Sequence, residues 1–300
     1  MSIERAWSTT AWTLLTLALT PVAALAGTPI NQRGAADPAG QVEISNTAGT
    51  VTVTGWNRNE VEVTGELGKG SERLEFGTSG KVTRVKVILP KKSYGVDGSD
   101  LIVKVPAGSS LSVNTVSADI RVRGVQGEQR LQSVSADIGT EASTEDVECK
   151  TVSGDVTVAG NGKRGLLTIT TVSGDASVTN AAGEVNGNTV SGNFNLGLRE
   201  TTRSRLRSTS GDLTMASRPV ADSRFDIESI SGDVRLDLVG PPDAEFDVSS
   251  FNGEIRNCIG PKPVRTSEYA PGRELRFREG QGSARIRIKT LNGDISVCSK

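Results

Sequence analysis

The stretch TVSGDVTV, residues Thr151–Val158, decides the fold, because close copies of it recur through the second half of the chain. The central Ser or Asn of the copies falls at Ser117, Ser135, Ser153, Ser173, Ser191, Ser210, Ser231, Asn252 and Asn292. The steps between these residues are 18, 18, 20, 18, 19, 21, 21 and 40, so the last is a double step. Such a period is typical of stacked units that each form one coil of a longer fold.

Aligned on the central residue, the copies form columns of one chemical type. The position two before it is always Thr or Ser, the position after it is always Ala or Gly, and most neighbouring positions are apolar. We expect apolar residues such as Val152, Val156 and Val158 to point into a core, and the hydroxyl column to face out. The small residue indicates a turn that needs a positive φ or a close approach of two backbones. The expected turn glycines are Gly154, Gly174, Gly192, Gly211, Gly232, Gly253 and Gly293.

Each copy is typical of a strand, a tight turn, a second strand and a return loop. One coil alone would expose its apolar column, whereas stacked coils bury it continuously. The sequence therefore predicts an all-β fold, a single stack of strands forming a β-solenoid or β-helix with about 18–21 residues per coil. Unrelated antiparallel hairpins in a sandwich would not require such regular columns. No stretch after the N-terminal apolar run has a convincing 3.6-residue pattern, so we expect almost no helix.

The sequence divides into four segments. Residues 1–26 contain a short apolar run and end in small residues at Ala26, which is typical of a cleaved signal peptide. Residues 27–40 are polar and predict a flexible leader. Residues 41–110 predict an N-terminal β region that is continuous with the solenoid and caps it, and residues 111–300 predict the repeat solenoid itself.

The signal peptide predicts an exported protein. No later segment is apolar enough to span a bilayer, so we expect no stable membrane anchor after cleavage. Periplasm, cell surface and extracellular medium are all compatible with this pattern.

The three cysteines fall into two classes. Cys258 and Cys298 each lie six residues after the central Asn of their copies, and they predict a disulfide in an oxidising compartment. Such a bond requires the two copies to be direct neighbours. The intervening insert, about residues 259–284, would then bulge outward as a hairpin. Cys149 falls in an apolar column and is expected to be a buried, inert thiol.

An acidic column lies two residues after the central position. Its aspartates are Asp119, Asp137, Asp155, Asp175, Asp212, Asp233 and Asp294, and Asn193 and Glu254 complete it. Like charges stacked at this spacing repel each other, so something must offset the repulsion. We favour hydrogen bonds from turn N–H groups to the carboxylates. A file of bound cations is the alternative, although one carboxylate per coil offers few of the six to eight oxygens that calcium prefers.

The composition excludes several kinds of chemistry. The chain has no histidine, which removes the commonest general base and metal ligand. The acids are spread evenly rather than gathered at one place, which argues against a polysaccharide-acting β-helix enzyme. A net charge of −1 gives no overall attraction to nucleic acid. The sequence predicts neither a catalytic residue nor a cofactor.

Arginine is dense near the C-terminus, at Arg265, Arg273, Arg276, Arg278, Arg285 and Arg287. These residues alternate with apolar ones on predicted strands. We interpret them as a solvated face, and contact with an anionic glycan or lipopolysaccharide is the alternative.

The repeated phrase resembles that of a bacterial "putative adhesin" family of β-strand-repeat proteins. Further similar stretches are Val51–Trp56, Asp100–Pro106, Tyr269–Gly272 and Leu291–Asp294. The resemblance covers about Val42 to the C-terminus. It implies a β-solenoid in an exported or envelope location, and it offers no catalytic or binding residues to transfer.

Together these patterns favour an exported, non-enzymatic β-solenoid that serves in adhesion or in another envelope interaction. Its expected partner is a glycan or a protein of the envelope or cell surface. A periplasmic scaffold or sensor partner without adhesion is the alternative, and a polysaccharide-acting enzyme comes third.

Overall fold

The computed structural model describes residues 27–91, 95, 97–269 and 271–299, so the predicted signal peptide (1–26) lies outside the described residues. Within these ranges every regular element is a β-strand and there is no helix. The predictions of an all-β fold and of almost no helix are confirmed for this part of the chain. The strands are β1 (Thr28–Ala35), β2 (Gln41–Trp56), β3 (Glu60–Leu67), β4 (Arg73–Ser79), β5 (Val82–Ile88), β6 (Ser99–Pro106), β7 (Ser110–Arg123), β8 (Gln129–Gln132), β9 (Ile138–Ala142), β10 (Val147–Lys150), β11 (Val156–Gly160), β12 (Arg164–Thr170), β13 (Ala176–Thr189), β14 (Phe194–Ser208), β15 (Leu213–Ser229), β16 (Val234–Leu238), β17 (Ala244–Asn252), β18 (Ile255–Asn257), β19 (Val264–Arg265), β20 (Arg273–Glu279), β21 (Ala284–Asn292) and β22 (Ile295–Ser299).

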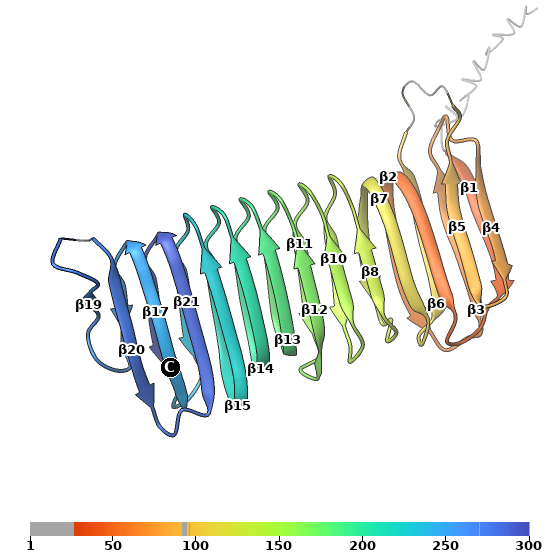
Figure 1. Ribbon diagram of the computed structural model, residues 1–300. Coiled ribbons are helices and arrows are strands. Elements are labelled where there is room, and N and C mark those ends of the chain that lie inside the picture. Colours follow the sequence, from red (N-terminus) through yellow and green to blue (C-terminus); the bar gives the residue numbers. More distant parts are fainter. Residues whose placement is uncertain (1–26, 92–94, 96, 270, 300) are drawn as a thin grey trace, which may run out of the picture.

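The strands form two faces, and strands that neighbour each other in space are parallel along most of the molecule (Figure 1). On one face β10 lies between β8 and β12, so that Val147 is opposite both Gln129 and Leu167. On the other face β11 lies between β9 and β13, where Val156 is opposite Ile138 and Ala176. We call these the β10 face and the β11 face. Each coil gives one strand to each face.

Pairing fixes the spatial order of the strands on each face. The β10 face runs β4, β5, the first halves of β2 and β7, β8, β10, β12, the second halves of β13, β14 and β15, then β21, β17, β20 and β19. The β11 face runs β1, β3, β6, the second halves of β2 and β7, β9, β11, the first halves of β13, β14 and β15, then β16, β22 and β18. The solenoid-like arrangement was predicted, but the expectation of a single stack is wrong. The turn in each coil sends the chain back along the opposite face, which makes two stacks.

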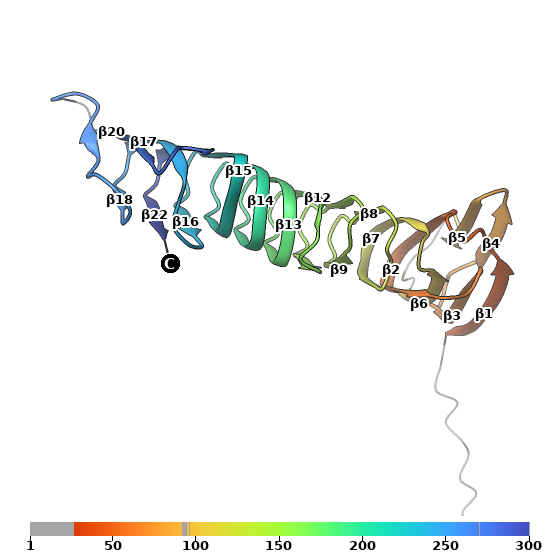
Figure 2. The same ribbon diagram turned by 90° about the horizontal axis from the view of Figure 1, so that it is seen from below.

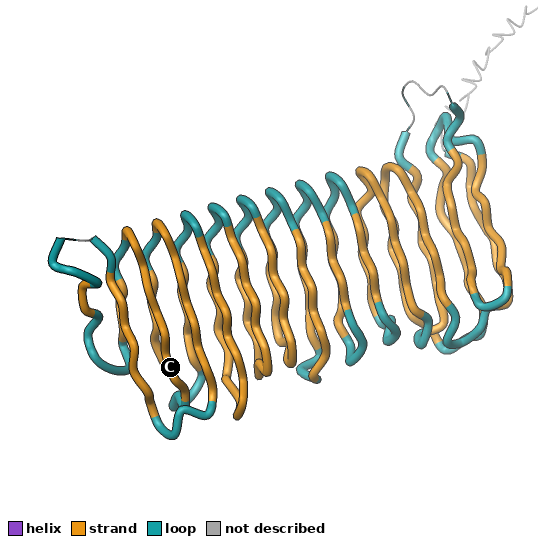
Figure 3. The backbone as a smooth tube through the Cα atoms, in the orientation of Figure 1, coloured by secondary structure: helices purple, strands orange, loops and turns teal. Residues whose placement is uncertain are grey.

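The core is a thin layer between the two faces. Seen from below, each coil is a flattened loop (Figure 2). Alternate strand residues point inward, so Phe194 and Leu196 of one face and Phe225 and Ile227 of the other are all buried. Turns and loops collect along the two long edges where the chain changes face (Figure 3).

The order of coils in space departs from chain order at both ends. The last coil of the chain, β21–β22, lies between β15–β16 and β17–β18. At the other end β2 lies between β5–β6 and β7. Antiparallel strands complete both ends, namely β4, β3 and β1 at one and β20 at the other. These strands cover the outer edges of the parallel stack on both faces at the first end and on the β10 face at the second, where β18 is the last strand of the β11 face.

Two expectations about the N-terminal region need correction. The predicted flexible leader, residues 27–40, contains strand β1, which pairs antiparallel with all of β3. Its backbone is needed there to pair the edge of β3, and Ile30 is buried in the core. In addition β2 is itself a copy of the repeat, since Asn46–Val51 lie in register with Thr115–Ile120. The absence of Ser-Gly-Asp from β2 concealed this copy.

The insert between Cys258 and the last coil does not simply bulge outward. It contains β19 and β20, which pair antiparallel with each other. All of β20 then lies antiparallel along Ala244–Ser250 of β17. Phe277 of β20 stacks on Phe246 of β17 with ring centres 4.4 Å apart, which gives the end of the solenoid an aromatic contact.

Candidate functional site

The hydroxyl column lies inside the fold, contrary to expectation. Its members Thr115, Ser133, Thr151, Thr171, Thr189, Ser208, Ser229, Ser250 and Thr290 are all buried. In most coils the hydroxyl oxygen accepts a hydrogen bond from the N–H of the turn residue three positions later. Gly154 donates to Thr151 at 3.1 Å and Gly174 donates to Thr171 at 2.9 Å. A buried hydroxyl is stable here because it satisfies a turn N–H that has no other partner in its own coil.

The neighbouring apolar column is exposed because the hydroxyl column takes the inward-facing position. Val152 was expected to point inward, but its exposed fraction is 44%. Adjacent strand residues point to opposite sides, and the hydroxyl occupies the inner position. The resulting apolar row along one edge comprises Val116, Val134, Val152, Val172, Val190, Ile230, Phe251 and Leu291, with the exposed Thr209 between Val190 and Ile230. Val156 and Val158, on the other side of the turn, are buried as predicted.

The turn glycines are required by close backbone approach. None of Gly154, Gly174, Gly192, Gly211, Gly232, Gly253 and Gly293 is among the described residues with positive φ. A Cβ on Gly174 would lie 1.9 Å from the carbonyl oxygen of Gly154, and one on Gly192 would lie 1.9 Å from that of Gly174. Of the two predicted reasons for glycine, the structure supports this second one.

The acidic column forms a ladder of hydrogen bonds between coils. Oδ1 of Asp137 accepts the N–H of Asp155 at 2.9 Å, and Oδ1 of Asp155 accepts the N–H of Asp175 at 2.8 Å. The donors are turn N–H groups, as predicted, but each belongs to the next coil. The column runs Asp119, Asp137, Asp155, Asp175, Asn193, Asp212, Asp233, Asp294 and Glu254.

This ladder gives each Asp a structural role and offsets the repulsion between coils. Among the described residues, no three His, Cys, Asp or Glu side chains gather closely enough to hold a metal ion.

Cys258 and Cys298 form the predicted disulfide, with their Cα atoms 4.8 Å apart. The bond joins the ends of β18 and β22, which pair in parallel. Cys149 is a free, buried thiol, and burial raises its pKa to about 12. A thiol with this pKa is a poor nucleophile at neutral pH, which agrees with the prediction of an inert core residue.

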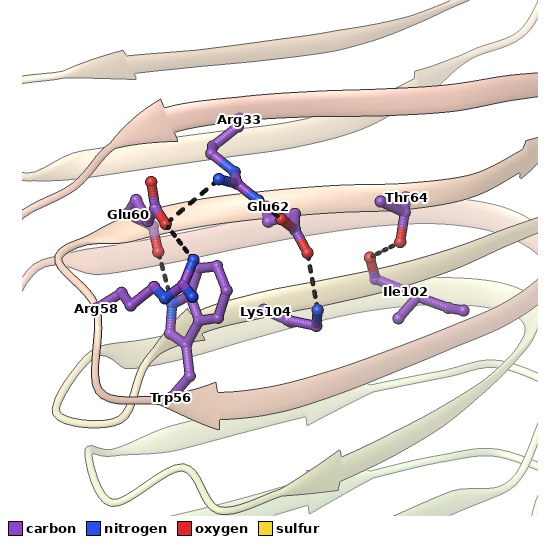
Figure 4. Close-up of polar contacts among 8 residues, drawn as sticks. All are labelled: Arg33, Trp56, Arg58, Glu60, Glu62, Thr64, Ile102 and Lys104. Carbon is purple, nitrogen blue, oxygen red and sulfur yellow. Dashed lines mark hydrogen bonds and ion pairs between the residues drawn. The ribbon is translucent and has the colours of Figure 1, made fainter.

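A compact ionic cluster lies on the β11 face near the N-terminus (Figure 4). The buried Glu62 accepts hydrogen bonds from Lys104, at 2.8 Å, and from Arg33. These bonds, that from Lys104 foremost, hold the pKa of the Glu62 carboxyl below its usual value. Lys104 and Arg58 also lie over the ring of Trp56. Every charge in this cluster has a partner, so it joins β1, β3 and β6 rather than leaving an open site.

A different charge pattern occurs on the β10 face of β14, β15 and β21. A shallow trough of about 340 Å³ is lined there by five exposed arginines and one acid, with the buried Phe225 and Ser204 beneath. The lining charged residues are Arg203, Arg205, Arg224, Asp226, Arg285 and Arg287. We call this the arginine trough.

The register of the strands explains this concentration of charge. Arg203 is opposite Arg224, and Arg224 is opposite Arg285, so three arginines lie side by side on adjacent strands. Acids lie opposite both ends of this row, namely Glu184 of β13 opposite Arg203 and Glu245 of β17 opposite Arg285. Like charges directly opposite on neighbouring strands are destabilising.

Few protein groups neutralise the trough. None of the ion pairs found in the described part of the chain includes Arg203, Arg205 or Arg224. Asp226 lies between Arg205 and Arg287 in register, yet one of its carboxylate oxygens is buried without a hydrogen-bond partner. Arg285 approaches Glu245 only at 3.5 Å, and Arg287 approaches Asp247 only at 3.9 Å.

Sequence reasoning found part of this surface. Arg285 and Arg287 belong to the predicted C-terminal set, and so do Arg276 and Arg278 of an adjoining hollow on β17 and β20. Arg203, Arg205 and Arg224 were missed because they belong to earlier coils. The alternation RSRLR at 203–207 was the available signal.

The described residues contain no helix with the length and apolarity needed to cross a membrane. The family model described as Toastrack DUF4097 matches residues 29–298. No curated protein matches the sequence.

Several solved structures are similar at low identity. One, described as a "putative lipid binding protein" from Parabacteroides distasonis, is 10% identical, with 90% of this chain and 97% of that chain covered and a TM-score of 0.49. A "putative adhesin" from Bacteroides fragilis is 8% identical, with coverage of 90% and 96% and a TM-score of 0.37. A "putative adhesin" from Parabacteroides distasonis is 9% identical, with coverage of 90% and 98% and a TM-score of 0.33. Because the family model spans nearly all of the described solenoid, this chain belongs to the Toastrack DUF4097 family.

Proposed function

We propose that this chain is an exported, non-enzymatic binding protein that acts in adhesion or in another interaction of the cell envelope. The observation that carries the proposal is the cluster of arginines on the β10 face at β14, β15 and β21, because Arg203, Arg205 and Arg224 are in none of the ion pairs found in the described part of the chain. Such a surface is suited to contact with negatively charged material. The disulfide between Cys258 and Cys298 supports export, because such bonds persist in oxidising compartments.

The repeated geometry of the coils supports a non-enzymatic role. The aspartates two residues after each central position accept backbone hydrogen bonds from the next coil, so they are engaged in holding the stack. A carboxylate pair free to act as acid and base would need a different arrangement. Depolymerisation of a polysaccharide by the purified chain would contradict this part of the proposal.

A periplasmic scaffold without adhesion is the second candidate. The apolar row favours it, since Val116, Ile230 and Phe251 are 46%, 49% and 54% exposed and lie on one edge. An exposed apolar row, interrupted here by Thr209, is the kind of surface that protein partners cover.

Cell fractionation combined with an attachment assay tests the proposed function. We expect the mature chain in an exported fraction, and a deletion strain that attaches less well to surfaces or retains less envelope polymer. Restoration by the full-length gene is the control. A chain found in the cytoplasm, or a deletion without effect on attachment or envelope polymer, would contradict the proposal.

A further inference from the structure

We infer that the arginine trough is a binding site for an anionic glycan, a polysaccharide that carries carboxylate, sulfate or phosphate groups. This inference rests on the proposed function and gives it a site and a ligand class. The trough combines five arginines with a single acid. A guanidinium presents a planar fork of donors that matches the paired oxygens of an oxyanion.

The spacing of the arginines suits a polymer better than a single small anion. Neighbouring strands lie about 4.8 Å apart, so the row of Arg203, Arg224 and Arg285 spans about 10 Å along the solenoid axis. Arg205 and Arg287 lie two residues further along the strands, on either side of Asp226, and form a second, interrupted row. Two rows of this length can contact anionic groups on successive sugars of one chain.

The adjoining hollow extends the same track toward the end of the solenoid. It shares Arg285 and Arg287 with the trough and adds Arg276 and Arg278. There the arginines are paired, since Arg276 contacts Asp247 at 3.2 Å and Arg278 contacts Glu245. The free charge is therefore concentrated over β14 and β15, which makes this part the centre of the site.

The trough is poorly suited to nucleic acid. Single strands are usually held by aromatic side chains on which the bases stack. The aromatic residue lining the trough, Phe225, is 1% exposed and belongs to the core. The net charge of −1 also provides no general attraction to a nucleic acid backbone.

The site can be tested with the purified chain and four labelled probes of similar length: polygalacturonate, dextran sulfate, a phosphorylated dextran and neutral dextran. We expect binding to one or more of the three acidic polymers and none to neutral dextran. Which acidic polymer binds most tightly identifies the anionic group. Binding should weaken as salt is added, because the exposed charges become screened.

Three variants locate the site. R203Q/R224Q should weaken binding about tenfold or more, because two charge-assisted contacts are lost. R121Q/R123Q removes the same charge from β7 on the β11 face and should leave affinity unchanged. D226N removes the acid within the trough and should tighten binding. Thermal melting of each variant checks that the fold is retained.

Several outcomes would overturn the inference. These are equal affinity of R203Q/R224Q and the unchanged chain, or an equal loss of affinity in R121Q/R123Q. Failure of the unchanged chain to bind any acidic polymer would also overturn it.

The attachment assay separates this site from the proposed function. If deletion reduces attachment and R203Q/R224Q fully restores it, the site is wrong and the proposed function stands. If the purified chain binds through the trough and deletion has no effect, the proposed function fails and the site stands.

Discussion

The N–H of Glu254 donates a hydrogen bond to Oδ1 of Asp294 at 2.8 Å, although the two residues are 40 positions apart. The N–H of Asp294 in turn donates to Oδ1 of Asp233 at 2.8 Å. The last coil of the chain is therefore held on both sides by earlier coils. At the other end β2 is enclosed in the same manner, between β6 and β7. This arrangement keeps the terminal coils away from the open ends, where a coil would have only one neighbour.

The disulfide should stabilise this enclosed coil. In C258S/C298S we expect the free energy of unfolding to fall by about 2–4 kcal/mol, because the unfolded chain regains the freedom of a 40-residue loop. Urea denaturation with and without reductant measures the effect. Reductant should destabilise the unchanged chain and leave C258S/C298S unaffected. Alkylation of the unfolded, unreduced protein should modify Cys149 alone, and modification of all three cysteines would contradict the bond.

The hydroxyl column offers a matched pair of substitutions. In T171V the turn N–H of Gly174 loses its buried acceptor, so we expect a loss of about 1–3 kcal/mol. Thr290 occupies the same column, but its hydroxyl oxygen is buried without a hydrogen-bond partner. T290V should therefore be neutral or slightly stabilising. Chemical denaturation of both variants is the measurement, and equal losses would show that the Gly174 hydrogen bond is unimportant.

The acidic column should depend on its hydrogen bonds and not on its charge. D155N keeps an oxygen that can accept the N–H of Asp175 and should change stability little, as Asn193 already occupies this column. D155A removes the acceptor and should cost roughly 1–2 kcal/mol. Adding calcium should leave the melting temperature of the unchanged chain where it is. A clear rise with calcium that D155N abolishes would instead support the cation file.

The repeat made much of the architecture predictable from sequence. The fixed step identified the coil, the matched positions of Cys258 and Cys298 identified the disulfide, and the glycine column identified the turn. These features depend on local chemistry that every copy repeats. These features could therefore be predicted from the aligned copies, whereas a single copy would not have been sufficient.

The remaining features depend on which of two adjacent side chains is buried, or on contacts between residues distant in sequence. Thr151 and Val152 are adjacent, and hydrophobicity alone predicts the wrong one to be inside, because the buried hydroxyl satisfies a turn N–H. The terminal coils do not follow chain order in space, and the period of the repeat does not determine which coils pair with each other. The arginine trough arises only when Arg203, Arg224 and Arg285 come into register across 82 residues of sequence.

The close approach of the turns should make the glycine column intolerant of a side chain. In G174A the new Cβ would lie 1.9 Å from the carbonyl oxygen of Gly154, so we expect a loss of about 3 kcal/mol or more. Gly139 provides the control, because the nearest atom to its Cβ would be 3.9 Å away. G139A should be neutral or slightly stabilising. Similar stability of the two variants in thermal melts would contradict the packing of the turns.

The ionic cluster at Glu62 should make the N-terminal region sensitive to acid. Hydrogen bonds from Lys104 and Arg33 lower the pKa of Glu62 from its ordinary value of 4.5. A carboxyl whose pKa is lowered by folding contributes its stabilisation above the unfolded pKa, and loses it as the pH falls through the folded pKa. The stability contributed by Glu62 is therefore present at pH 7 and decreases below about pH 4.5.

The substitution E62Q tests this assignment. It should lower stability at neutral pH, because Lys104 and Arg33 lose their anionic partner, and it should flatten the decline of stability toward low pH. E66Q on the same strand is the control, because Glu66 takes part in none of the ion pairs of the described N-terminal strands. Urea denaturation at a series of pH values gives both curves. An acid decline equally steep in E62Q and in the unchanged chain would show that other carboxyls cause it.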